Sequence, residues 1–271
     1  MARYVPDIHT HRWIVLAPVR SQRPDEEKEE PVAKKTVCPF CYGHEDMTPP
    51  ESLRWGDGEP NKPGWLVRVV PNKFAITDVH EVIIHSPDHT KDLPDLSTQQ
   101  VELILKVYRE RYKHYAQEGQ VLLFCNYGKE SGASLIHPHS QLVVIPRQIK
   151  LDTLSREPVR NVVEENTHFT VYCPDFSQWP YEVWITPKKD YVFDQITDEQ
   201  LYDLAPILQG VIKKLHEKFP DLAYNYYIHP GSEWYLRVMP RTVIRAGFEL
   251  GTGLAVNIAD PTEAATFLRQ K

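Results

Sequence analysis

The chain contains one order of sequence patterns twice, and this repeat limits the fold more than any other feature. One stretch begins EVIIHSPDH at residue 81, and the other begins EVWITPKKD at residue 182. Each starts with a strand-like run, passes a proline and reaches a helical pattern with apolar residues three and four positions apart. Ser97 or Thr98 and, in the second copy, Thr197 are the expected amino-terminal caps of these helices, and a glutamine lies three residues after Ser97 and after Thr197. Chance is the alternative explanation, since strands and helices alternate in many proteins.

Two further strand patterns follow each predicted helix. Strands that are close together in the chain tend to pair antiparallel, and a helix between them covers one face of the sheet. We therefore predict an α+β fold of two tandem units, with antiparallel sheets and flanking helices. Residues 121–128 and 139–147 of the first copy correspond to residues 223–231 and 233–241 of the second, where both copies end in Pro-Arg.

The length of 271 residues suits two units of ordinary size, which we place at residues 1–150 and 151–271. The formal charge is 31 − 37 = −6, and the chain has no long basic block. Nucleic acid is therefore not expected as a partner, because its phosphate backbone requires a concentrated positive surface. No apolar run approaches the ~20 residues that cross a bilayer, and the amino terminus lacks a signal-peptide pattern. These features predict a cytoplasmic protein that binds no membrane.

The two copies differ in their last strand pattern, where only the first copy contains histidines. His137, His139 and Gln141 occupy alternate positions, so the three would share one face of a strand. Neutral histidine is a nucleophile at cellular pH, and its attack on phosphorus would split one transfer into two easier steps. Just upstream, Ser134 follows small residues and offers a hydroxyl group to a phosphate. The alternative is a pair of strand histidines whose hydrogen bonds go to neighbouring carbonyl groups.

Cys38-Pro-Phe-Cys41 has the spacing at which two thiolates bind one zinc ion. Redox pairs use the same spacing, but they need a helix that begins at the first cysteine. The prolines that follow Cys41 argue against such a helix. A zinc site needs two further ligands, for which His44 is the local candidate and His89 and His137 are the distant ones. Spacing alone does not choose among these histidines.

These motifs resemble the histidine-triad superfamily, and specifically its transferase branch, in which a glutamine replaces the third histidine. The resemblance to the galactose-1-phosphate uridylyltransferase family extends over almost the whole chain. It implies that His139 is the nucleophile of a covalent nucleotidyl-histidine intermediate, and that Ser134 and Gln141 contact the transferred phosphate. It also implies that one structural zinc ion is bound by Cys38, Cys41, His89 and His137.

The same resemblance assigns residues to the nucleotide and the sugar. Arg20 and Arg23, after the first strand, would reach the diphosphate, and Asn126 would contact the phosphate. The residues expected around the base and ribose are Phe40, Asn72, Phe74 and Val82. Phe248 and Glu249, near the carboxy terminus, would contact the sugar. Two alternatives remain: the arginines are merely solvated, and the apolar residues belong to the core.

Three departures from the family's pattern leave the base and the sugar open. The second metal motif of the galactose enzymes is replaced by residues 234–240, so a second metal is not expected. Val243 and Ile244 occupy the place of a basic residue, with Arg245 next to them. Ser140 stands where the galactose enzymes have glycine, which is a feature of plant-type ADP-glucose phosphorylases.

The leading hypothesis is a ping-pong nucleotidyltransferase whose substrates are a nucleotide-sugar and a sugar 1-phosphate. The first choice is a UDP-glucose:hexose-1-phosphate uridylyltransferase of galactose metabolism, and the alternative in the same class is an ADP-glucose or dinucleoside-polyphosphate phosphorylase. Two alternatives belong to other classes: a hydrolase of nucleotide conjugates, and a non-catalytic, zinc-stabilised nucleotide-binding protein. The resemblance further implies a homodimer in which site residues can cross the interface.

Overall fold

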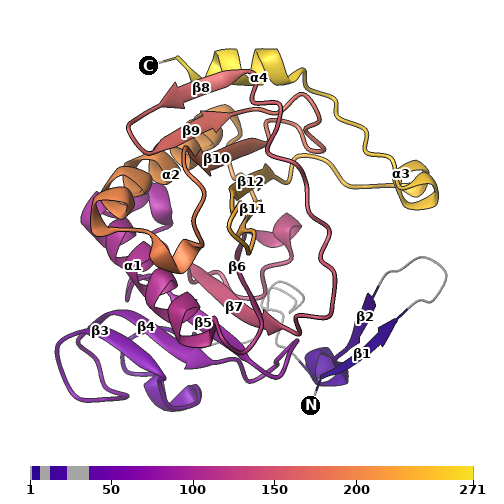
Figure 1. Cartoon of the computed structure of the whole chain (residues 1–271). Coiled ribbons are helices and arrows are strands. Elements are labelled where there is room, and N and C mark those ends of the chain that lie inside the picture. Colours follow the sequence, from indigo (N-terminus) through magenta and orange to yellow (C-terminus); the bar gives the residue numbers. More distant parts are fainter. Residues whose placement is uncertain (1, 7–12, 23–36, 271) are drawn as a thin grey trace.

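A computed structural model describes residues 2–6, 13–22 and 37–270. Its main feature is a ten-stranded antiparallel sheet with the strand order β3-β4-β5-β7-β6-β11-β12-β10-β9-β8 (Figure 1). A separate hairpin consists of β1 (Arg3–Pro6) and β2 (Trp13–Leu16). The strands of the sheet are β3 (Leu53–Gly56), β4 (Trp65–Pro71), β5 (His80–Ile84), β6 (Gln120–Tyr127), β7 (His139–Ile145), β8 (Val162–Glu165), β9 (Phe169–Tyr172), β10 (Val183–Pro187), β11 (Tyr224–Ile228) and β12 (Leu236–Pro240).

The two sequence copies contribute their strands to the sheet in the same order, each counted from its own edge toward the middle. The first copy runs β5, α1 (Thr98–Tyr115), β6 and β7, and the second runs β10, α2 (Asp198–Lys218), β11 and β12. The copies meet where β6 pairs with β11, with Asn126 opposite Asn225. The predicted α+β fold with antiparallel strands is confirmed, and the strands of both copies form one continuous sheet. The division into two units near residue 150 stays a prediction.

Both long helices begin where the sequence predicts. The hydroxyl groups of Ser97 and Thr197 each accept a hydrogen bond, at 3.2 Å, from the backbone N–H of the glutamine three residues later. Oε1 of Gln200 in turn accepts a hydrogen bond from the backbone N–H of Thr197, which completes a capping box. Gln100 instead donates to the backbone carbonyls of β4 and of the residue after β5. The first helix is therefore tied directly to the strands that precede it.

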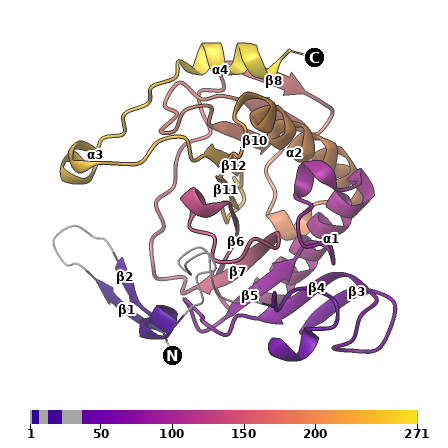
Figure 2. The same cartoon turned by 180° about the vertical axis from the view of Figure 1, so that it is seen from behind.

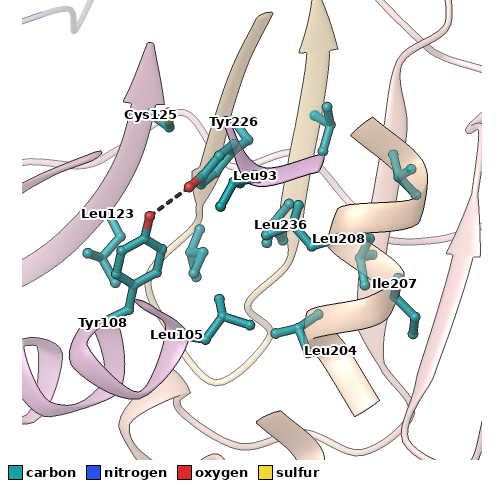
Figure 3. Packing of buried hydrophobic residues seen from close by; sticks show 14 of the residues in the cluster. Leu93, Leu105, Tyr108, Leu123, Cys125, Leu204, Ile207, Leu208, Tyr226 and Leu236 are labelled. Carbon is teal, nitrogen blue, oxygen red and sulfur yellow. Dashed lines mark hydrogen bonds between the residues drawn. The ribbon is translucent and has the colours of Figure 1, made fainter. Parts of the chain in front are cut away.

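The main core lies between the sheet and the two helices. Leu105 and Tyr108 of α1 and Leu204 and Leu208 of α2 are buried against apolar side chains of the sheet (Figure 3). Each buried side chain of this size contributes about 1.5–3 kcal/mol through removal from water. The helices thus cover one face of the sheet and hold the histidine strand β7 from behind.

The opposite face of the sheet is called the inner face below, and among the described residues no long helix packs on it. The hairpin β1–β2 and a segment with the short helix α3 (Gly247–Thr252) project on this side (Figures 1 and 2). A last helix, α4 (Pro261–Leu268), lies near β8. Among the described residues, no helix has the length and apolar character needed to cross a membrane.

Candidate active site and metal cluster

His139 is the first residue of β7, in the middle of the first copy's strands. Alternation along the strand places His139 and Gln141 on the inner face and Ser140 on the helix side. The Nδ1 atom of His139 lies 2.9 Å from the backbone oxygen of His137, which can only accept a hydrogen bond. Nδ1 therefore carries the proton, and the lone pair of the neutral ring lies on Nε2. Nε2 is thus the nitrogen that can attack phosphorus.

His139 lines a cavity of about 100 Å³, several times the ~30 Å³ that one water molecule occupies in the liquid. The cavity is large enough for a phosphate-sized anion, and residues from four separate segments of the chain surround it. Seven of the sequence-predicted residues line it together: Ser134, His139, Gln141, Phe40, Asn72, Phe74 and Val82. Sequence reasoning missed Met47, Val70 and Leu135, which also line the cavity and carry no chemical motif that would reveal them.

The loop that carries Ser134 depends on a glycine at its start. Gly128 ends the approach from β6 with φ +78°, a conformation that L side chains rarely adopt. A Cβ atom there would also lie only 2.8 Å from Cβ of Ala223. Gly128 therefore lets the loop turn back, past a short 3-10 helix (Lys129–Ser131), to the edge of the cavity. Ser134 reaches the site through this turn.

Behind β7, the Ser140 side chain takes part in a buried network of hydrogen bonds. Its Oγ lies 2.5 Å from Nε2 of His85 and 3.1 Å from the hydroxyl of Tyr226, and it also bonds to the hydroxyl of Tyr108. The two tyrosine hydroxyls are 2.6 Å apart (Figure 3). Burial lowers the pKa of His85 to about 3, so the ring is neutral at pH 7. Side chains from α1 and from strands of both sequence copies thus converge on Ser140, the residue after His139.

Cys38, Cys41, His89 and His137 form a cluster whose candidate ligand atoms all lie within 4.8 Å of one another. Sγ of Cys41 is 3.4 Å from Nδ1 of His89, and both sulfur atoms are 3.7 Å from Nδ1 of His137. With bonds of about 2.3 Å to sulfur and 2.0 Å to nitrogen, a tetrahedral zinc site places these atoms about 3.5 Å apart. The donor set therefore fits a zinc ion.

The protonation of His137 also suits a metal ligand. Its Nε2 lies 2.8 Å from the backbone oxygen of Ser86, so Nε2 donates and Nδ1 keeps a lone pair toward the sulfur atoms. Burial lowers the pKa of His137 to about 4. His44 is not part of the cluster, because its Nδ1 contacts the backbone oxygen of Cys38. No helix begins at Cys38, as expected for a metal site rather than a redox pair.

The remaining predicted contacts are more dispersed. Arg20 lies in a short 3-10 helix (Pro18–Gln22) and donates to the backbone oxygen of Phe74 at 2.9 Å, whereas Arg23 lies outside the described residues. Oδ1 of Asn126 accepts a hydrogen bond from Asn225 at 2.7 Å. Phe248 and Glu249 lie in α3, an exposed segment that does not line the His139 cavity of its own chain. The structure therefore brings seven of the predicted residues to one cavity, whereas Arg20, Asn126 and the predicted sugar residues do not line it.

A larger hollow of about 1670 Å³ lies farther along the inner face. It is lined by the hairpin, by apolar residues of β6 and β7, and by residues 148–154. The smaller cavity is the stronger candidate for chemistry, because a nucleophile, an amide and a hydroxyl group converge there.

Comparison with known proteins identifies relatives of the chain. Residues 78–144 match the family model for galactose-1-phosphate uridyl transferase, N-terminal domain. ADP-glucose phosphorylase of Arabidopsis thaliana is 28% identical and covers 96% of this chain and 90% of its own length. A galactose-1-phosphate uridylyltransferase of Thermotoga maritima is 24% identical and covers 96% of both chains.

Solved structures show the same fold. The crystal structure of an ADP-glucose phosphorylase from Arabidopsis thaliana with bound ADP-glucose has a TM-score of 0.77 and 26% identity, and the match covers 100% of this chain and 99% of that chain. A uridylyltransferase structure has a TM-score of 0.76 at 22% identity, which supports the fold alone. The fold and the histidine strand define a nucleotidyltransferase of the histidine-triad type. The chain is therefore similar to the galactose-1-phosphate uridylyltransferases and to ADP-glucose phosphorylase.

Proposed function

We propose that the protein transfers a nucleoside monophosphate from a nucleotide-sugar to an acceptor phosphate through a covalent bond to Nε2 of His139. The observation that supports the proposal is the convergence of His139, Gln141 and Ser134 on one cavity with Phe40 and Asn72. A nucleophile, neutral hydrogen-bonding groups and an apolar wall are what a nucleotidyl transfer requires in one place.

The proposed reaction has two displacement steps. In the first, the lone pair of Nε2 forms a bond to the α-phosphorus, the bond from that phosphorus to its bridging oxygen breaks, and sugar 1-phosphate leaves with the electron pair. In the second, an oxygen of the acceptor phosphate attacks the same phosphorus, and the pair of the broken P–N bond returns to Nε2. The bond from Nδ1 to the His137 carbonyl keeps the ring oriented and stabilises its positive charge in the intermediate.

Gln141 and Ser134 would serve as hydrogen-bond partners of the phosphoryl oxygens. A carboxamide and a hydroxyl group remain neutral throughout, so neither repels the charge that develops on these oxygens. Phe40 packs edge-on to the His139 ring, with 5.3 Å between the ring centroids, and is buried. The aromatic ring therefore limits the orientations that the nucleophile can adopt.

We further propose that the cysteine–histidine cluster holds one structural zinc ion. Four protein ligands would leave no open position, so a bound ion would supply a rigid anchor rather than a reactive centre. The anchor lies close to the nucleophile, because His137 is two residues before His139. The cluster would thus hold the chain in place just before the first residue of β7.

We also propose that the protein works as a homodimer. Phe248 is 56% exposed, and its segment also exposes Leu250 and Leu254. The segment lies away from its own cavity, so the sugar residues would have to reach a site through a second copy of the chain. A monomeric protein with full activity would contradict this part of the proposal.

Uridine with glucose and galactose 1-phosphates is the first candidate for the substrates, as the family model suggests. Two observations favour ADP-glucose with inorganic phosphate as a second candidate. The Arabidopsis phosphorylase matches nearly the whole chain, and the family resemblance of the histidine motif puts Ser140 where a glycine is expected in the galactose enzymes. The Ser140 side chain is fully bonded behind β7, so it does not itself read the base.

A labelling experiment tests the proposal. Purified protein is incubated separately with UDP-glucose and ADP-glucose that carry ³²P in the α-phosphate, and acid-labile label is mapped by mass spectrometry. We expect label on His139, and a His139→Gln variant should lose at least about 10⁴-fold in the labelling rate. The exposed His114 provides the control, since His114→Gln should label normally.

The acceptor arm of the experiment separates the two candidates. Galactose 1-phosphate or inorganic phosphate is added to the labelled protein, and the released nucleotide product is identified. Label that persists in His139→Gln would contradict the proposed nucleophile, and release to water at the rate seen with acceptors would indicate a hydrolase.

A further inference from the structure

His80 is the first residue of β5 and lies between the cavity loop that follows β4 and the histidine strand β7. Its side chain is 4% exposed. In the pairing of β5 with β7, Val82 stands opposite Gln141, so His80 is a diagonal neighbour of Gln141 on the same face. No sequence motif marks this histidine, because its contact with Gln141 spans 61 positions of the chain.

The hydrogen bonds of His80 determine where its proton lies. The backbone N–H of Ile76 donates to Nδ1 of His80 at 2.9 Å, so Nδ1 presents a lone pair. The proton of the neutral ring is then on Nε2. Nε2 lies 2.9 Å from Oε1 of Gln141 and donates to that oxygen.

This bond fixes the direction of the Gln141 carboxamide. With Oε1 bonded to His80, the NH₂ group is the part of the carboxamide that is left to donate to a ligand in the cavity. The flipped carboxamide would place its NH₂ group against the N–H of His80, so both donors would lose their acceptor. Among the described residues, no hydrogen bond uses the Gln141 NH₂ group.

The same histidine also organises the loop that lines the cavity. The backbone N–H of Asn72 donates to the backbone oxygen of His80 at 2.8 Å, and Oδ1 of Asn72 accepts from the N–H of Phe74 at 2.8 Å. Nδ2 of Asn72 lies 3.1 Å from Nε2 of His80, and because both nitrogens carry hydrogen this is a contact without a hydrogen bond. His80 therefore contacts both the loop expected to hold the base and ribose and the amide expected to hold the phosphate.

We propose that His80 is a positioning residue of the nucleotidyl transfer: the Ile76 N–H fixes its tautomer, and its Nε2–H turns the NH₂ group of Gln141 toward the phosphoryl oxygens. The inference rests on the proposed function. His80 touches no reacting atom and exchanges no proton, so its effect on the rate passes through Gln141.

Two substitutions separate the two nitrogens of His80. The amide of asparagine reaches the position of Nδ1 but not that of Nε2, whereas the amide of glutamine reaches the position of Nε2 and carries a donor there. We expect His80→Asn to slow single-turnover labelling of His139 by about 10–100-fold, because neighbours of a reacting group typically have effects of this size. The loss should appear in kcat with little change in KM, and His80→Gln should recover a large part of it.

A double-mutant cycle shows whether His80 acts through Gln141. In a Gln141→Ala background, His80→Asn should slow labelling by less than about twofold, since the group that it orients is gone. Equal losses in both backgrounds would overturn the inference, and so would a His80→Gln variant no faster than His80→Asn. The matched control is His229→Asn, which replaces another buried histidine outside the cavity and should keep the wild-type rate.

A measurement on the unmodified protein covers the case in which the variants fold poorly. Histidine ¹⁵N NMR distinguishes a protonated from an unprotonated ring nitrogen, and His80 is expected to be protonated at Nε2 only. Protonation at Nδ1 would overturn the inference while the labelling of His139 remains intact. A wild-type protein that forms no nucleotidyl-histidine would overturn the proposed function and this inference with it.

Discussion

On β7 the inner face of the sheet presents His139 and Gln141 to a cavity, whereas on β12 the same face presents Arg237 to a buried carboxylate. The guanidinium of Arg237 bonds to both oxygens of Glu182 at 2.7 and 2.8 Å. Beside it, the rings of Trp184 and Tyr235 stack with 4.1 Å between their centroids. The second copy thus pairs the charge on this face with a carboxylate of its own chain.

The difference shows how one sheet supports both a site and a structural wall. In the second copy, Leu154 and Val159 pack against the aromatic cluster, and the larger hollow reaches this face only beside Tyr227 and Arg237. In the first copy, the corresponding strands leave the cavity and an NH₂ group that no described residue uses. Strand order is shared by the two copies, so the side chains on the inner face, and not the order of the strands, decide which copy can carry out chemistry.

The largest loss of stability is expected when the cysteine–histidine cluster of the first copy is disrupted. We expect Cys41→Ser to lose the bound zinc and to lower the free energy of unfolding by on the order of 5 kcal/mol or more, because structural zinc contributes about 10–16 kcal/mol of binding free energy to a folded state. Labelling of His139 should slow by at least about tenfold. Metal analysis, urea unfolding and single-turnover labelling measure these effects.

The buried Cys173 lies outside the cluster and supplies the control for the metal experiment. Cys173→Ala should keep its zinc and its labelling rate, and a chelator should reproduce the effect of Cys41→Ser in the wild type. A Cys41→Ser protein with undiminished zinc and stability would show that the cluster is not a structural metal site.

The ion pair of the second copy should matter for stability alone. Glu182→Gln would leave the Arg237 guanidinium buried without a countercharge, which typically costs 3–5 kcal/mol. The carboxylate of Glu182 accepts five hydrogen bonds: two from Arg237, two from the backbone N–H groups of residues 178 and 179, and one from the Trp184 indole. A neutral amide at this position cannot accept all of them. Urea unfolding should show the loss, while the labelling rate of the folded protein stays within about twofold of the wild type.

Glu217 provides the matched control for Glu182→Gln. It pairs with Lys214 at 3.0 Å on the surface, where such pairs contribute about 0–1 kcal/mol. Glu217→Gln should therefore unfold almost as the wild type does. Equal stability of the Glu182 and Glu217 variants would mean that the inner face of the second copy is hydrated and not filled.

The sequence alone predicted the parts of the molecule that depend on local pattern. The caps at Ser97 and Thr197, the antiparallel α+β fold and the face shared by His139 and Gln141 follow from periodicity over a few residues. His137, expected on the same strand face, lies before the first residue of β7. Cavity-lining residues such as Phe40 came only from the family resemblance. Contacts that depend on register between distant strands escaped both approaches, as for His80 and Gln141.

Two failures of sequence reasoning have distinct physical causes. Spacing did not choose among His44, His89 and His137, because metal ligands are brought together by the fold and not by the chain. The glutamates that begin the two repeated stretches look equivalent, yet Glu81 bonds to Arg111 of α1 and Glu182 bonds to Arg237 of β12. The two lie on opposite faces of the sheet, because the register of pairing differs between the copies.

The smallest predicted effect concerns His229, which reports whether the inner face of the second copy excludes water. The ring stacks on Tyr235 with 4.9 Å between centroids, and burial lowers the pKa of His229 below its ordinary value of 6.5. Below pH 6.5 this histidine is protonated in the unfolded chain but stays neutral in the folded protein. Its contribution to the free energy of unfolding is therefore complete above pH 6.5 and is lost as the pH falls toward the pKa of the folded state. One such group adds at most about 1.4 kcal/mol per pH unit to the slope of the unfolding free energy.

Urea unfolding between pH 7 and pH 5 should therefore show a shallower slope for His229→Asn than for the wild type, whereas replacement of the exposed His114 by asparagine should leave the slope unchanged. Identical slopes for wild type and His229→Asn would place water beside the ring and make the second copy's inner face as open as that of the first.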